Sequence, residues 1–374
     1  MCAIGLIGDG GARDAGYQMR QRARRADGRS CIYNGNCCFI RSAPAEACGG
    51  CRSHGFRDFS WRESRLHFES RLLLRGGCTQ HDRTSNQSPP LRSMDSQSPL
   101  FIRVDGPEGA DPVILLHGGP GASHDYLYPQ MLFLAERHRV IAYDQRGGGQ
   151  SRTGESAPVT WRTHVDDLAM IAEQFGIAAP TIVGYSWGGL LALLYAIHAS
   201  ELNAPVPSRL VLVSPAPITR EWRAEFEKTL AERSRSERIT EMRSSLGESG
   251  LRESDPAAFR QRSFELSVAG YFADPEKAVE LTPFRVIQKV QQSVWESLGD
   301  YDLRDSLQHL SIPSLVLHGR HDPIPIASSE ALAQLLGARL VVLEHSGHVP
   351  YVEQLAALST AVEEFLDVTA TPAQ

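Results

Sequence analysis

Cysteine is absent after position 78: all seven cysteines lie between Cys2 and Cys78. Residues 94–374 therefore cannot be stabilised by disulfides or by a thiolate metal site. Long apolar runs are also missing, since none approaches the roughly 20 residues that span a bilayer. The formal net charge is −6, so the sequence lacks the excess of basic residues that is typical of a nucleic-acid-binding protein. With 42% hydrophobic residues, the composition predicts a globular protein with a sizeable core and neither nucleic acid nor membrane as a partner.

Lysine is absent from residues 1–93, which hold 15 Arg, 8 acidic residues and every cysteine. The segment lacks sustained helix or strand periodicity, so we expect a disordered extension, or a translated leader ahead of a natural start at Met94. Cys48 and Cys51 have redox or zinc spacing, but no regular second pair of ligands follows, and no metal site is expected. Secretory and transit signals also fit poorly, which favours a cytoplasmic location.

From Met94 onward, short aliphatic segments alternate with helical patterns, as is typical of a mostly parallel sheet covered by helices. Strands are expected at residues 100–104, 113–116, 140–143, 181–183, 210–213, 314–317 and 340–343. Thr160 should cap a helix that ends before Gly176, and further helices are expected at 187–197 and 355–366. The predicted fold class is α/β.

Residues 218–300 interrupt this alternation. They are polar and helix-prone, with many Arg and Glu residues and no clear strand pattern. Strands are expected on both sides, and a loop of this length without structure is uncommon in a compact domain. We therefore predict a helical cap, inserted into a core made of residues 94–217 and 301–374.

The sequence Gly184-Tyr185-Ser186-Trp187-Gly188 lies between an expected strand and an expected helix. In that context, G-x-S-x-G forms a sharp turn that projects the serine hydroxyl, while the glycines remove Cβ clashes around it. A hydroxyl becomes a good nucleophile only when a base takes its proton. Ser186 is therefore the predicted nucleophile of a serine hydrolase.

Two glycine-rich loops follow the neighbouring strands. In residues 117–121, His-Gly-Gly-Pro-Gly, the N–H of Gly119 is expected to stabilise an oxyanion together with that of Trp187. His117 is expected to brace this loop. The second loop, residues 144–151, lacks the Gly-Lys-Ser/Thr ending of a phosphate loop, and we expect Asp144 and Arg146 to pair in it.

An acid and a base are expected after the last two strands. Asp322 follows the strand at 314–317, and His348 follows the strand at 340–343. The order Ser, Asp, His is that of a G-x-S-x-G hydrolase, with all three at strand ends. His348 would take the Ser186 proton, and Asp322 would orient the imidazole. His345 is a rival base with less reach, and His321 should point elsewhere.

These features together resemble the proline iminopeptidase branch of the α/β-hydrolase family. The resemblance rests on the H-G-G-P-G loop, the D-Q-R-G-x-G-x-S element at residues 144–151, the elbow around Ser186, Asp322 and His348. It covers nearly all of residues 94–374 and is weakest in the cap. It implies removal of an N-terminal residue, often proline, from a short peptide, without metal or cofactor.

The substrate is less well defined by the sequence. Family members that act on peptides look as if they bind the α-amine with cap carboxylates, yet Gln291 and Gln292 stand late in this cap. Glu221, Glu225 and Glu296 are candidate substitutes, although each alone is more typical of a solvated helix face. The alternative function is a carboxylesterase, or another small-molecule ester hydrolase, on the same scaffold. The complete Ser, Asp and His set disfavours an inactive binding module, and oligomeric state stays open.

Overall fold

The computed structural model of the chain describes residues 100–154 and 158–368. The predictions for residues 1–93 and for a start at Met94 lie outside the described residues. Within the described part, seven strands form one sheet in the order β1-β3-β2-β4-β5-β6-β7. Strand β1 is antiparallel to β3, and every other pair is parallel. The predicted α/β class is confirmed.

All seven expected strands are present, with ends that differ from the prediction by at most two residues. They are β1 (Ile102–Asp105), β2 (Pro112–Leu116), β3 (Arg139–Tyr143), β4 (Thr181–Tyr185), β5 (Arg209–Val213), β6 (Ser314–Gly319) and β7 (Arg339–Leu343). The side chains of a strand alternate between its two faces. Ile114 and Leu116 accordingly belong to one buried cluster, and Val113 and Leu115 belong to the other.

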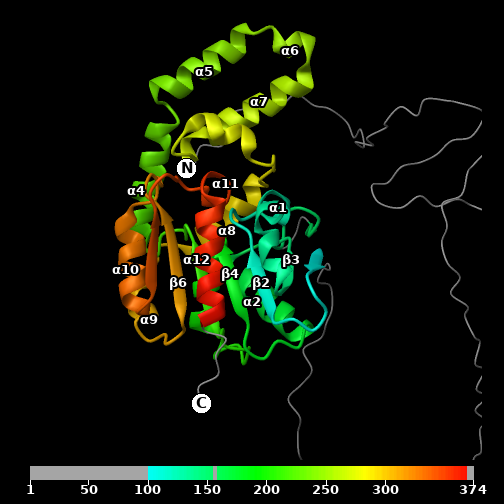
Figure 1. Cartoon of the computed structure of the whole chain (residues 1–374), viewed down its shortest axis with the longest axis vertical. Coiled ribbons are helices and arrows are strands. Elements are labelled where there is room, and N and C mark those ends of the chain that lie inside the picture. The colour runs from blue at the N-terminus through cyan, green and yellow to red at the C-terminus, as the bar shows by residue number, and fades with distance from the viewer. Residues whose placement is uncertain (1–99, 155–157, 369–374) are drawn as a thin grey trace, which may run out of the picture. The chain divides into compact units, whose positions relative to one another are not determined.

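Helices cover both faces of the sheet (Figure 1). One face packs against α2 (Trp161–Gln174), α3 (Trp187–His198), α9 (Arg304–Leu307) and α10 (Ile326–Leu336). The other packs against η1 (His124–Tyr126), α1 (Tyr128–Met131), η2 (Leu132–Glu136), α11 (Pro350–Glu353) and α12 (Leu355–Val368). Helix α2 begins as expected, with a reciprocal capping box between Thr160 and Thr163. It ends before Gly176, whose φ of +63° suits a residue without a Cβ.

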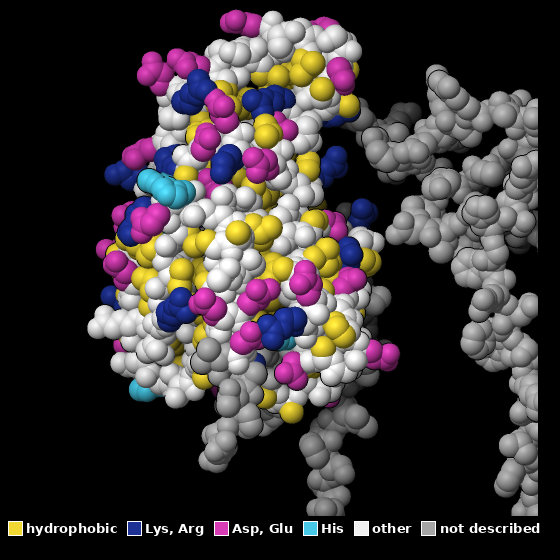
Figure 2. Space-filling model, in the orientation of Figure 1, with side chains coloured by type: hydrophobic (Ala, Val, Ile, Leu, Met, Phe, Trp, Pro, Cys, Tyr) yellow, Lys and Arg dark blue, Asp and Glu magenta, His cyan; other side chains and the backbone are white. Residues whose placement is uncertain are grey.

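Residues 218–300 form helices and no strand. They contain α4 (Arg220–Arg233), α5 (Glu237–Glu248), α6 (Leu251–Ser254), α7 (Pro256–Val268), η3 (Ala269–Tyr271), η4 (Pro275–Glu280) and α8 (Gln288–Leu298). Helices α5, α6 and α7 lie beyond the end of the sheet (Figure 1). We call residues 218–300 the cap. Acidic and basic side chains are interspersed over its visible surface (Figure 2), as its polar composition predicts.

The chain enters and leaves the cap at one place. The N–H of Arg220 donates to the carbonyl of Tyr301 at 2.8 Å, and the N–H of Leu303 donates to the carbonyl of Ile218 at 3.0 Å. Between them, Thr219 and Asp302 form an isolated antiparallel bridge. The two connections between cap and core therefore run side by side.

Across the two described ranges, no helix combines the length and the apolar character that crossing a membrane requires.

Candidate active site

Ser186 occupies a sharp turn between β4 and α3. Its φ of 52° and ψ of −116° are unusual for a residue with a Cβ. The flanking glycines make this turn possible, because an added Cβ at Gly184 would lie 2.4 Å from the carbonyl oxygen of Gly188. One at Gly188 would lie equally close to the carbonyl oxygen of Leu116. The local sequence thus places the serine hydroxyl at the carboxyl end of the sheet.

His348 and Asp322 complete a hydrogen-bonded chain with Ser186. The Nε2 atom of His348 lies 3.0 Å from the Ser186 hydroxyl oxygen. Its Nδ1 atom lies 2.9 Å and 3.1 Å from the two carboxylate oxygens of Asp322. The tautomer that satisfies both contacts donates from Nδ1 to Asp322 and accepts the Ser186 proton at Nε2. The turn after β4 and the loops after β6 and β7 therefore bring together the three residues that the sequence singles out.

The Asp322 carboxylate is completely buried, and its pKa is the balance of opposing effects. Burial raises the pKa, but the charge and the hydrogen bonds of His348, with smaller contributions from His318 and the Ile324 N–H, outweigh burial. The net result is a pKa below the ordinary value of an aspartate. An ionised Asp322 can orient the imidazole and stabilise its protonated form.

Two residues with candidate backbone donors line the same cavity as Ser186. Trp187 lies in the first turn of α3, where N–H groups have no partner within the helix. Gly119 lies on the loop after β2 with a φ of +68°, and it lines the same cavity as Ser186 and Trp187. Two N–H groups on that cavity are the kind of donors that stabilise a tetrahedral oxyanion.

His117 braces this loop rather than facing the nucleophile. Its Nε2 accepts the Gln145 N–H at 3.1 Å, and the Gln145 side chain donates to the His117 carbonyl at 2.7 Å. The same amide accepts from the indole N–H of Trp187 at 2.8 Å. Burial lowers the pKa of His117 to about 4, so the ring stays neutral. This network links the two loops that carry the candidate oxyanion donors.

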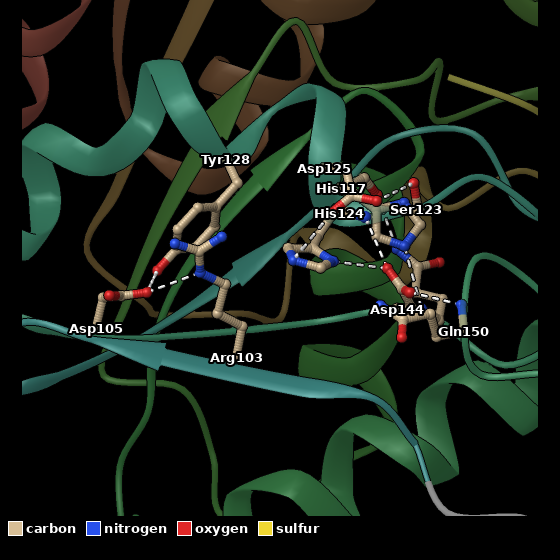
Figure 3. A network of polar contacts seen from close by, with 10 residues as sticks. Arg103, Asp105, His117, Ser123, His124, Asp125, Tyr128, Asp144 and Gln150 are labelled. Carbon is tan, nitrogen blue, oxygen red and sulfur yellow. Dashed lines mark hydrogen bonds and ion pairs between the residues drawn. The ribbon is translucent and has the colours of Figure 1, made fainter. Parts of the chain in front are cut away.

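The expected pairing of Asp144 with Arg146 is wrong. Asp144 accepts instead from the backbone and ring of His124, at 2.9 and 2.7 Å, and from the Gln150 N–H at 2.7 Å (Figure 3). Arg146 pairs with the buried carboxylate of Asp167 on α2. Both contacts still fix the loop after β3, but their partners lie 20 and 21 residues away in sequence.

A cavity of about 110 Å³ lies over Ser186, between core and cap. Its wall is mainly aromatic and includes Tyr126, Tyr185, Trp187, Phe226, Tyr271, Phe284, Trp295 and Tyr351. Arg223 and Gln291 are the polar cap residues on it. Among the described residues, no carboxylate side chain lines this cavity.

A family model described as alpha/beta hydrolase fold matches residues 111–355. The chain belongs to the alpha/beta hydrolase fold family. It is 26% identical to a proline iminopeptidase of Lactobacillus delbrueckii subsp. bulgaricus, over 71% of this chain and 93% of that protein. It is 25% identical to a proline iminopeptidase of Clostridioides difficile, over 71% and 94%.

Solved structures of the family share the fold. A proline iminopeptidase from Mycobacterium smegmatis superposes with a TM-score of 0.53 at 22% identity, covering 72% of this chain and 94% of that one. A 2-hydroxy-6-oxo-6-phenylhexa-2,4-dienoate hydrolase from Rhodococcus superposes with 0.52 at 24% identity, covering 72% and 94%. The protein is thus a hydrolase of this family, with relatives named as proline iminopeptidases.

The structure places the three candidate cap glutamates of this hydrolase outside the cavity. Glu221 and Glu225 lie on the exposed side of α4, and Glu296 is exposed on α8, where it accepts from Gln292 at 2.6 Å. The polar cap residues that do line the cavity, Arg223 and Gln291, come from the same two helices. The rival bases His321 and His345 are both exposed.

Glu353 has a larger part in the site than its sequence position indicates. Its buried carboxylate accepts from the N–H of Gly347 at 2.7 Å and from that of Ala273, in the cap, at 2.8 Å. Burial raises its pKa, against the opposing effect of these hydrogen bonds. The N–H of His348 also donates to the cap carbonyl of Tyr271 at 2.7 Å. The loop that carries His348 is thereby joined to the cap.

Proposed function

We propose that the protein is a serine hydrolase that cleaves a carboxylic ester through an acyl-enzyme. The observation that carries this proposal is the hydrogen-bonded chain from Ser186 through His348 to Asp322, at the floor of an apolar cavity. This arrangement supports each proton transfer that such a reaction requires.

In the proposed mechanism, His348 accepts the Ser186 proton as the hydroxyl oxygen attacks the substrate carbonyl carbon. The N–H groups of Gly119 and Trp187 stabilise the oxyanion. The imidazolium, held by Asp322, then gives its proton to the leaving group, and the acyl group stays on Ser186. Water, activated by His348, releases the acid and restores the hydroxyl.

An ester is favoured over a peptide by the cavity wall. An aminopeptidase must hold a charged α-amine, and burying an unpaired ammonium in an apolar site is costly. No carboxylate of the described residues lines the cavity, and the charged cap residue on it is the cation Arg223. A neutral ester avoids that cost.

The second candidate is an aminopeptidase of the proline iminopeptidase type. It is favoured by the relatives of that name, which match over more than nine tenths of their length. The aromatic cavity of about 110 Å³ also suits a compact apolar ring. In this case the α-amine would have to remain outside the cavity or enter it uncharged.

Hydrolysis of p-nitrophenyl butyrate and of proline β-naphthylamide separates the two candidates. We expect turnover of the ester and little of the arylamide. The matched control is Ser186→Ala, which should lose at least about 10³-fold in kcat on any substrate. Turnover of the arylamide alone would favour the aminopeptidase, and unchanged activity in Ser186→Ala would reject Ser186 as the nucleophile.

A further inference from the structure

The cap wall of the cavity carries a guanidinium. Arg223 projects from α4, lines the cavity together with Ser186, and has a side chain that is only 13% exposed. The described wall offers no carboxylate against it. A cation on a largely apolar wall needs a compensating partner, and the nearest carboxylate, that of Glu227, lies on the same helix.

Three charged side chains share the inner face of α4. Arg220, Arg223 and Glu227 are spaced at i, i+3 and i+7, which places them on one side of the helix. The charges of all three act on the phenol of Tyr301. Burial is the main cause that raises the pKa of Tyr301, while the charges of Arg223 and Arg220 lower it and that of Glu227 raises it. Two guanidinium groups and one carboxylate leave this cluster with one unbalanced positive charge.

The internal pairing of this cluster is incomplete. Arg223 Nη2 lies 2.8 Å from Glu227 Oε1, yet that oxygen accepts no well-aligned hydrogen bond. The Nη1 atom of Arg220 is buried and has no acceptor among the described residues. Buried polar atoms without partners are destabilising, so Glu227 does not fully compensate the two guanidinium groups, of which Arg223 alone lines the cavity.

Aromatic stacking holds Arg223 beside the reaction centre. Its guanidinium carbon lies 3.8 Å from the centre of the Trp295 ring, and Trp295 contacts Trp187 edge-on at 4.9 Å. Stacking occupies the face of a guanidinium and leaves the N–H groups at its edge available to a carboxylate. Gln291 lines the same cavity and can add an amide donor.

We propose that this cavity selects substrates that carry a carboxylate, and that Arg223 is the residue that binds it. The inference rests on the proposed serine hydrolase and names its substrate class: small esters whose acyl or leaving group ends in a carboxylate. The apolar walls hold the hydrocarbon part, and the positive charge of Arg223 on the cavity wall repels an ammonium. Arg223 is thus a specificity-determining residue.

Matched pairs of esters test this selection. The acyl-side pair is the mono-p-nitrophenyl ester of adipic acid and that of adipamic acid, which replaces the carboxylate by a neutral amide. The leaving-group pair is 4-carboxyphenyl butyrate and 4-carbamoylphenyl butyrate. In at least one pair, we expect kcat/KM of the wild-type enzyme to favour the carboxylate by on the order of tenfold, mainly through KM, because hydrogen bonds to charged groups are about twice as strong as neutral ones.

In Arg223→Gln, kcat/KM for the carboxylate ester should be close to kcat/KM for its neutral partner. Arg223→Lys should retain part of the wild-type preference. The double variant Arg223→Gln/Glu227→Gln gives the same test without leaving Glu227 as an unpaired buried charge. Arg162→Gln is the matched control, because Arg162 stacks on Trp161 at 4.6 Å but lies on the exposed side of α2. Arg162→Gln should show the same carboxylate preference in kcat/KM as the wild type.

Two outcomes overturn the inference: no wild-type preference for the carboxylate in either pair, or a carboxylate preference that survives Arg223→Gln. Failure of the proposed function looks different, because no ester is then hydrolysed faster by the wild type than by Ser186→Ala. Binding remains measurable in that case. Adipate should quench tryptophan fluorescence in the wild type at concentrations at which adipamide does not, and Arg223→Gln should abolish this difference.

Discussion

The floor of the cavity is supplied by loops at the ends of strands, whereas its cap wall is supplied by faces of helices. The floor comprises Ser186, His348 and the Gly119 loop, with Asp322 buried behind His348, and the cap wall comprises Arg223, Phe226, Gln291 and Trp295. In the floor, backbone geometry dictates where each functional group lies. In the cap wall, the docking of each helix decides which side chains face the substrate. We expect substitutions in the floor to change the rate of the chemistry and substitutions in the cap wall to change which substrate is accepted.

The largest effect expected in the floor, after removal of the nucleophile, is that of Asp322→Asn. An asparagine in this place favours the wrong tautomer of His348, and kcat should fall by about 10⁴-fold. Steady-state kinetics on p-nitrophenyl butyrate measures this loss, and a thermal melt followed by circular dichroism confirms that the variant folds. A folded variant with nearly normal kcat would show that Asp322 does not orient His348.

Glu353→Gln should give the next largest effect. A glutamine keeps one carbonyl oxygen but puts an N–H donor in place of the other, so it can accept from only one of Gly347 and Ala273 and faces the other with a donor; the His348 loop must then shift. A displacement of this kind lowers kcat by about 10–100-fold, while KM should change little. The matched control is Glu344→Gln, since Glu344 is an exposed partner of Arg320 just before the same loop. An equal loss in both variants would contradict a specific role for Glu353.

The pH dependence of stability should distinguish Asp322 from its asparagine variant. The folded-state pKa of Asp322 is lowered, so its ionisation stabilises the fold above the unfolded pKa of about 3.9. That stabilisation is lost as pH falls through the lower folded pKa. In urea melts, the free energy of unfolding of the wild type relative to Asp322→Asn should therefore decrease on acidification below about pH 4. An increase in this free-energy difference on acidification would contradict a lowered pKa of Asp322 in the folded state.

The smallest effect is expected from the exposed cap glutamates. The triple variant Glu221→Gln/Glu225→Gln/Glu296→Gln changes three charges that do not line the cavity. Its kcat/KM should stay within about twofold of the wild type on esters, since exposed charges interact weakly through water. A selective loss of arylamide hydrolysis would instead assign one of them to an α-amine and reduce the contrast between floor and cap wall.

The sheet and the placement of the floor residues could be predicted because local signals suffice for them. Aliphatic strands bounded by turn residues specify the sheet, and a glycine-flanked serine between strand and helix specifies the elbow around Ser186. Asp322 and His348 follow from the position of the last two strands. The pairing of Asp144 with Arg146 failed because their actual partners, His124 and Asp167, come from other segments.

The cap wall could not be predicted for a physical reason that α4 illustrates. No residue of this helix is fully buried, and its few large apolar residues, Trp222, Phe226 and Leu230, do not decide which of the charged residues beside them faces the cavity. Glu221, Arg223 and Glu225 are then equivalent candidates from sequence alone. Only the docking of α4 against Tyr301 and Trp295 turns Arg223 inward.

The paired connections at Thr219 and Asp302 bear on how caps can be exchanged between enzymes of this fold. An insertion whose two ends meet across a single bridge can be exchanged, lengthened or shortened while the host scaffold keeps its own ends in place. A hybrid that joins residue 219 to 302 through a foreign helical segment should acquire the donor's selectivity, and it should retain the hydrolytic machinery when that segment also restores the contacts of the Tyr271 carbonyl and the Ala273 N–H with the His348 loop and Glu353. The cap can therefore be exchanged as a unit, so that a new substrate selectivity can arise on an unchanged catalytic core.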